Sequence, residues 1–139
     1  MVTASVLTLY LAQAIGLYVL LVGLSGLARP QRWAALIDDL ATSPALQFIA
    51  GVLVFAIGVA LILAHSHVTD ALAIIVTLVG WLALLEGALL IAVPDPLIRL
   101  GRLAVRYTRI WAILCIVIGL LLGLAGVTGQ AGAVAPVYI

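Results

Sequence analysis

Four long apolar runs dominate this sequence, and each has about the 20 residues that a helix needs to cross a bilayer. Only 8% of the residues are charged, against roughly 25% in an ordinary soluble domain. The sequence therefore predicts a single all-α integral membrane domain over residues 1–139, with four transmembrane helices. The four predicted spans cover residues 5–27, 45–64, 71–93 and 110–127.

The two longer connectors between these spans have the pattern of amphipathic helices that lie on the membrane surface. In the connector between the first two spans, Trp33 and Ile37 fall on one side of a helix and Asp38 falls on the opposite side. The connector between the last two spans alternates leucines and arginines in the same manner. We expect surface helices over residues 31–41 and 96–108.

The second surface helix carries a strip of arginines spaced three, four and three residues apart, which places them within one arc. Such a strip either binds anionic lipid or a partner, or fixes the helix at the level of the lipid headgroups. Four arginines reach only the lower edge of the cluster size expected for lipid recognition, which favours the second role. The strip consists of Arg99, Arg102, Arg106 and Arg109.

All six basic residues of the chain are arginines, and all lie in or beside these two connectors. Basic residues next to a span resist translocation across the bilayer. The sequence thus predicts a multi-pass protein of the inner (plasma) membrane with both long connectors in the cytoplasm. Both termini and the short turn at residues 65–70 are expected on the outside.

The chain also contains an apparent internal repeat. Shifting it by 64 residues places Gly23 on Gly87 and Pro30 on Pro94. This predicts two parallel pseudo-repeats, each made of a span, a surface helix and a span, related by an axis along the membrane normal. The two repeats cover residues 5–64 and 71–127.

Every span carries a pair of glycines seven residues apart, a spacing that returns to nearly the same side of a helix. Small residues let neighbouring helices approach closely, which is how helices associate in lipid. We expect these glycines to pack helices within the chain, or between copies of it. The glycines are Gly16, Gly23, Gly51, Gly58, Gly80, Gly87, Gly119, Gly123 and Gly126.

The first half of the chain carries a short motif. Gly23 and Leu24 near the end of the first span are followed by Pro30, then by Trp33, and then by Pro44 before the second span. This order resembles the small two-helix bacterial inner-membrane proteins of the YjeT-like family. The resemblance implies the span, surface helix and span architecture with a cytoplasmic connector, and it implies no particular activity.

The second half is similar to the same family through Glu86, Gly87 and Pro94. It differs in having Leu97 where the family has tryptophan, while the first half has Val22 in place of the family's glutamate. The resemblance therefore covers most of both halves with short motifs.

Glu86 is the only acidic residue inside a predicted span, roughly 10 Å from its cytoplasmic end. A charged group at such a depth is costly and is a functional candidate by default. One interpretation is a proton-coupled site, as in the four-span small multidrug transporters. The other, which we favour, is a structural carboxyl that hydrogen-bonds a neighbour such as Gln47 or reaches an arginine of the surface helix, because structural networks also perturb acids.

Other chemistry is weakly indicated. His65, His67 and Asp70 could supply three ligands to a metal ion, but a short turn rarely points three side chains inward, so we expect no metal and no cofactor. No phosphate-binding loop or nucleophile motif is present in the sequence, and we expect no enzyme activity. The net charge of +1 argues against nucleic-acid binding.

The sequence as a whole favours a non-enzymatic integral membrane protein that acts as a structural or accessory module. Its expected partners are membrane lipids and either further copies of the chain or another membrane protein. The alternative is a small proton-coupled transporter or channel subunit that uses Glu86.

Overall fold

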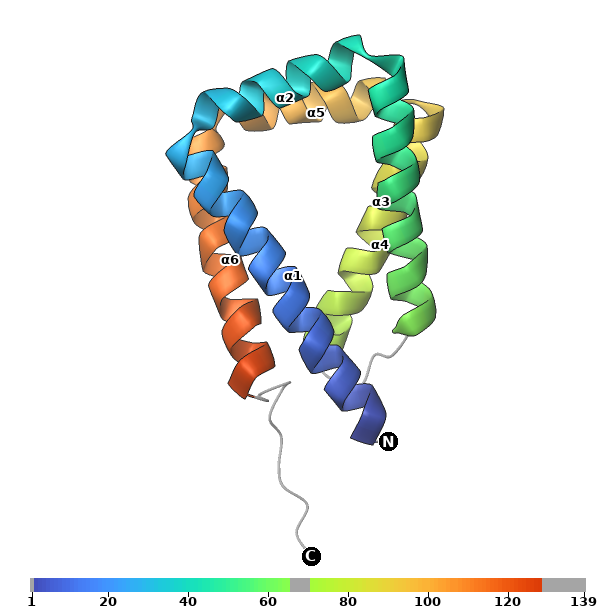
Figure 1. Ribbon diagram of the computed structural model, residues 1–139, viewed down its shortest axis with the longest axis vertical. Helices are drawn as coiled ribbons and strands as arrows, with labels where there is room; N and C mark the ends of the chain where they lie inside the picture. Colours follow the sequence, from blue (N-terminus) through green and yellow to red (C-terminus); the bar gives the residue numbers. More distant parts are fainter. Residues whose placement is uncertain (1, 66–70, 129–139) are drawn as a thin grey trace, which may run out of the picture.

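The computed structural model describes residues 2–65 and 71–128, and this part of the chain is helical apart from short breaks (Figure 1). The all-α prediction is confirmed. Each helix end lies within two residues of its predicted position, except that the first helix begins three residues earlier. The helices are α1 (Val2–Ala28), α2 (Pro30–Thr42), α3 (Pro44–Ala64), α4 (Ala71–Ala92), α5 (Asp95–Arg106) and α6 (Thr108–Thr128).

Four of these helices, α1, α3, α4 and α6, are long and apolar enough to cross a membrane. The mean hydropathy of their spanning segments is between 2.0 and 2.7. Many of their large apolar side chains are exposed: Leu63 is 81% exposed and Leu121 is 63% exposed. Such surfaces are compatible with lipid as the surrounding medium, because lipid tails are as apolar as leucine.

Prolines set the corners between the spans and the surface helices. Pro30 is the first residue of α2 and Pro44 the first residue of α3, where the missing proline N–H would have no partner in any case. Ser43 lies between these two helices, and its hydroxyl accepts a hydrogen bond from the N–H of Leu46 at 3.3 Å. The chain therefore turns sharply from α2 into α3.

The four long helices form two antiparallel pairs, α1 with α6 and α3 with α4 (Figure 1). The pairs meet at one end and diverge toward the other, where α2 and α5 lie side by side across them. The two halves of the chain have equivalent places in this arrangement, in which α4 corresponds to α1, α5 to α2 and α6 to α3. Under this correspondence the α1–α6 pair is equivalent to the α3–α4 pair. This is the relation expected of two parallel repeats, although the internal repeat itself remains a prediction from the sequence.

Within each pair the predicted glycines allow very close backbone contact. A Cβ atom added to Gly58 would lie 2.3 Å from the backbone nitrogen of Leu84, and one added to Gly87 would lie 2.3 Å from that of Phe55. Both glycines therefore lie at the close contact between α3 and α4. A Cβ atom would also lie within 3.0 Å of backbone atoms at Gly16, Gly23, Gly119 and Gly126. At Gly51 and Gly80 the nearest atoms are in side chains, at 2.8 Å and 3.1 Å.

Gly123 contributes to the α1–α6 contact through its backbone alone. A Cβ atom added there would meet nothing within 4 Å. Its backbone is nevertheless part of the α1–α6 contact, because a Cβ on Gly16 would lie 2.6 Å from the Gly123 nitrogen. Gly16 thus packs against the backbone of Gly123, while the space around the Gly123 Cα atom has room for a side chain.

The two pairs contact each other at the end away from α2 and α5, which we call the closed end. A small buried cluster of apolar side chains lies there, and it joins α1, α4 and α6. Its buried members are Ala12, Leu72, Val76 and Leu122.

Candidate functional site

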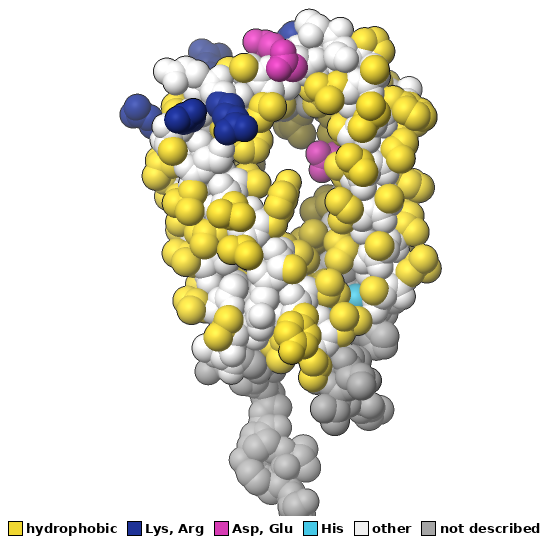
Figure 2. Space-filling view, viewed as in Figure 1, with side chains coloured by type: hydrophobic (Ala, Val, Ile, Leu, Met, Phe, Trp, Pro, Cys, Tyr) yellow, Lys and Arg dark blue, Asp and Glu magenta, His cyan; other side chains and the backbone are white. Residues whose placement is uncertain are grey.

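An opening passes between the two helix pairs, bounded at one end by α2 and α5 and at the other by the closed end (Figure 2). The space-filling view shows its walls to be largely apolar, with one acidic side chain at its margin at the level of the long helices. Glu86 is the only acidic residue in the four spanning segments.

The position of Glu86 on α4 follows from helix geometry. Leu72 and Val76 of the same helix are buried in the contact with the α1–α6 pair. Glu86 follows Leu72 by 14 residues, nearly four turns, so the two side chains point in directions only about 40° apart. Because the pairs have diverged at this level, Glu86 faces the opening and is exposed.

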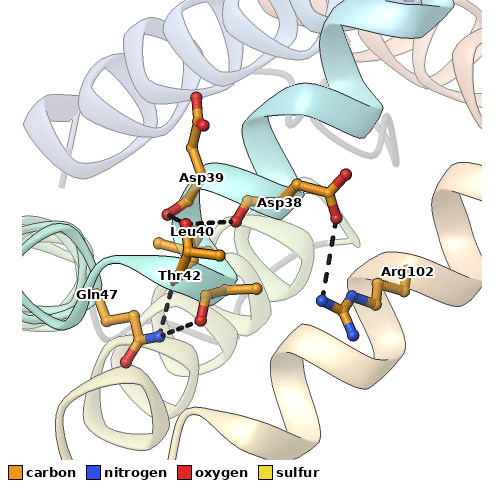
Figure 3. Close-up of polar contacts among 7 residues, drawn as sticks. Asp38, Asp39, Leu40, Thr42, Gln47 and Arg102 are labelled. Carbon is orange, nitrogen blue, oxygen red and sulfur yellow. Dashed lines mark hydrogen bonds and ion pairs between the residues drawn. The ribbon is translucent and has the colours of Figure 1, made fainter.

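Glu86 makes no hydrogen bond or ion pair with any residue that the structure describes. The predicted partner Gln47 is engaged elsewhere, because its Nε2 donates to the carbonyl oxygen of Leu40 at 2.8 Å (Figure 3). The last carbonyls of a helix have no partner inside that helix, and Gln47 supplies one at the end of α2. The interpretation of Gln47 as a hydrogen-bond partner of Glu86 is therefore wrong.

The predicted contact between Glu86 and an arginine of the surface helix is also absent from the described part of the chain. Arg102 instead lies 4.0 Å from Asp38 and joins α5 to α2 (Figure 3). Both side chains of this ion pair are more than half exposed, so it contributes little to stability.

The arginine strip lies on an exposed side of α5 and the start of α6, as its spacing predicts. Arg99, Arg102, Arg106 and Arg109 are all exposed. Figure 2 shows most of the visible basic side chains gathered at one corner of the molecule, near the junctions of α2 and α5 with α1 and α6.

The predicted metal ligands are described only in part, since His67 and Asp70 lie outside the described residues. His65 ends α3 and is 2% exposed. Its Nε2 lies 2.6 Å from the hydroxyl oxygen of Thr8, and its Nδ1 lies 3.4 Å from that of Thr77. His65 therefore links α1, α3 and α4 at the closed end, and the described residues contain no cluster of three metal-ligating side chains.

Sequence reasoning did not identify this link. Its signal is present in the sequence, since Thr8, Thr77 and His65 are isolated polar residues close to the same ends of three apolar runs. Polar side chains in membrane helices commonly form hydrogen bonds between helices.

Two glycines outside the seven-residue spacing were also missed as packing residues. A Cβ on Gly101 would lie 2.9 Å from Ile37, and one on Gly26 would lie 3.2 Å from Ala112.

Comparisons with protein-family models, with curated proteins and with solved structures find no match for this chain. The resemblance to the YjeT-like proteins accordingly remains a prediction from the sequence motifs.

Proposed function

We propose that this chain is a small non-enzymatic membrane protein that acts as an accessory module, and that a transmembrane helix of another membrane protein packs against the opening between its helix pairs. The observation that carries the proposal is the position of Glu86. The residue faces the opening, among apolar walls, without a partner in the described part of the chain.

Charge complementarity indicates the kind of partner. A carboxyl group at this depth is costly in lipid unless a cation or a hydrogen-bond donor faces it. The four spans contain no lysine, and their only arginine is Arg109 in the first turn of α6. A second copy would bring the same spans and no cation at the depth of Glu86, so the favoured occupant is a helix of a different protein with a basic side chain at that depth.

The environment of the histidine supports a non-enzymatic role. Thr8 and His65 have the hydroxyl–imidazole contact that nucleophilic catalysis uses. However, the two residues are only 3% and 2% exposed, and they lie inside the contact between the helix pairs. A substrate has no access to this hydroxyl, which supports a structural role for the contact.

Association through Glu86 can be tested in native membranes solubilised in a mild detergent. The wild-type chain is expected to migrate as a complex larger than a single chain. Glu86→Leu is expected to lose that complex, because the partner's polar group would then face an apolar side chain. The matched control is Leu85→Ala, on a side of α4 that does not face the opening. A complex that survives Glu86→Leu unchanged contradicts the proposal.

A second candidate is a small proton-coupled transporter or channel subunit, which the exposure of Glu86 to the opening also favours. The two candidates differ in vesicles under an imposed pH gradient. An accessory module gives no proton-linked flux above empty vesicles, for either the wild type or Glu86→Gln. Flux in the wild type that is lost in Glu86→Gln would replace the accessory role by transport.

We further propose that α2 and α5 lie in the cytoplasm and that the closed end and both termini lie outside the inner (plasma) membrane. This rests on the six arginines, all of which are in or beside α2 and α5. Reporter fusions at residues 67 and 103 are expected to label opposite sides of the membrane. Labelling on the same side would refute this orientation.

A further inference from the structure

The corner where α1, α2, α5 and α6 meet contains a feature that the role of Glu86 does not use. An apolar cavity of about 240 Å³ lies there, and all four helices contribute to its lining. Residues on its walls include Gly26 of α1, Trp33 and Ile37 of α2, Ala104 of α5 and Cys115 of α6.

Trp33 gives this cavity a polar group without a partner in the described part of the chain. Its indole Nε1 is buried and has no hydrogen-bond partner in the described part of the chain. The indole N–H can only donate, and a buried donor without an acceptor is costly. A Cβ on Gly26 would lie 3.5 Å from this nitrogen, so the N–H is held close to the cavity wall of α1. A ligand with an apolar body and one carbonyl oxygen would satisfy it.

A second pocket of about 460 Å³ adjoins the first, and Val105 and Thr108 line both of them. Its lining is mostly apolar, but it also includes two basic side chains, Arg106 and Arg109. Both arginines are exposed, and the ion pair found between the described surface helices uses Arg102 instead. Two free guanidinium groups at one pocket suit a phosphate group.

We infer that this corner binds one anionic phospholipid. Its phosphate lies between Arg106 and Arg109, an ester carbonyl accepts from the Trp33 N–H, and part of an acyl chain fills the apolar cavity. The arginines at one pocket and the apolar walls of the adjoining cavity match the two ends of such a lipid. Basic pockets beside membrane helices are known binding sites for anionic headgroups. Free phosphate would occupy only the second pocket. It would leave the apolar cavity unfilled and the indole N–H without an acceptor.

The inference is tested with the purified full-length chain in detergent. The chain is titrated with phosphatidylglycerol or with phosphatidylcholine of the same acyl chains, and the bound lipid is counted by native mass spectrometry. The wild type is expected to bind one phosphatidylglycerol in preference to phosphatidylcholine. The double variant Arg106→Gln and Arg109→Gln is expected to weaken binding about 20-fold, since each surface arginine contributes roughly a factor of five.

The matched control is the double variant Arg99→Gln and Arg102→Gln, which removes the same charge from residues that do not line either pocket. It is expected to bind within about twofold of the wild type, since neither arginine lines a pocket and exposed charges away from the lipid are screened by salt. Equal weakening by the two double variants would show an effect of net charge and overturn the site. Equal binding of the two lipids would overturn it as well.

The apolar part of the site has its own variants. Ala104→Leu places a larger side chain on the cavity wall and is expected to reduce lipid binding, whereas Ala35→Leu, on an exposed side of α2, is not. If Ala104→Leu binds lipid as the wild type does, or if inorganic phosphate displaces the lipid completely, the pocket is a phosphate site and the lipid assignment is wrong. Far-UV circular dichroism of each variant identifies any that fails to fold.

Discussion

Gly87→Ala is expected to destabilise the protein by about 2 kcal/mol or more, although alanine is the better helix former. The added Cβ would lie 2.3 Å from the nitrogen of Phe55 and 2.6 Å from its Cα. Backbone atoms cannot rotate away as a side chain can, so α3 and α4 have to move apart. The free energy of unfolding can be measured by titrating the chain in mixed micelles with a denaturing detergent and following its circular dichroism.

Gly123→Ala is the matched control for this substitution. It makes the same chemical change in another spanning helix, but the new Cβ meets nothing within 4 Å. The expected result is no loss of stability, or a gain of up to about 1 kcal/mol from the higher helix propensity of alanine. If the two variants lose equal stability, the close contact between α3 and α4 described above is wrong.

Glu86→Leu is expected to have opposite effects on stability and on association. The isolated chain should become more stable by about 1–3 kcal/mol in a bilayer, because an unpaired carboxyl inside a span is replaced by an apolar side chain. The complex with the partner should be lost at the same time. Glu86→Gln, which removes the charge and keeps a polar group, should fall between the wild type and Glu86→Leu in stability.

The sign of the stability change separates two roles for this residue. A loss of stability in the isolated Glu86→Leu chain would indicate that Glu86 has a stabilising partner within its own chain. Reversible unfolding in bicelles with matched samples of the wild type gives the sign directly. The change in the free energy of unfolding differs between these two outcomes by several times the usual effect of a surface substitution, which is within about 0.5 kcal/mol.

Much of this fold could be predicted from local sequence signals. Apolar runs of spanning length gave the four long helices, and prolines at positions 30 and 44 gave the corners. The seven-residue glycine spacing also identified the sides on which helices touch. These signals are local and depend on length, backbone restriction and helical periodicity, which act without knowledge of the neighbouring helices.

Only part of the helix pairing could be predicted in the same way. The short connection between the second and third spans predicts that α3 and α4 are antiparallel neighbours, whereas no local signal predicts that α1 packs on α6. Lipid-facing and helix-facing side chains in a membrane are both apolar, so periodicity does not show which helix meets which. That α1 packs on α6, and α3 on α4, is set by contacts between the two halves of the chain.

The surroundings of Glu86 and Gln47 depend on this pairing. Gln47 has a depth similar to that of Glu86, but it is recruited by the free carbonyls at the end of α2. Glu86 faces an opening because the two pairs diverge, which no local feature of the sequence encodes. The corner pockets depend likewise on four helices that meet only in the folded chain.

The central claim is that a helix of another membrane protein packs against the opening in front of Glu86. It is tested most directly by a photo-crosslinking amino acid placed in native membranes at Val79, seven residues before Glu86 and on nearly the same side of α4. The control position is Leu85, which is 58% exposed and about 140° from the direction of Leu72. We predict an adduct with a different membrane polypeptide from position 79 and none from position 85. No adduct from position 79, equal adducts from both positions, or an adduct with a second copy of this chain would contradict the account.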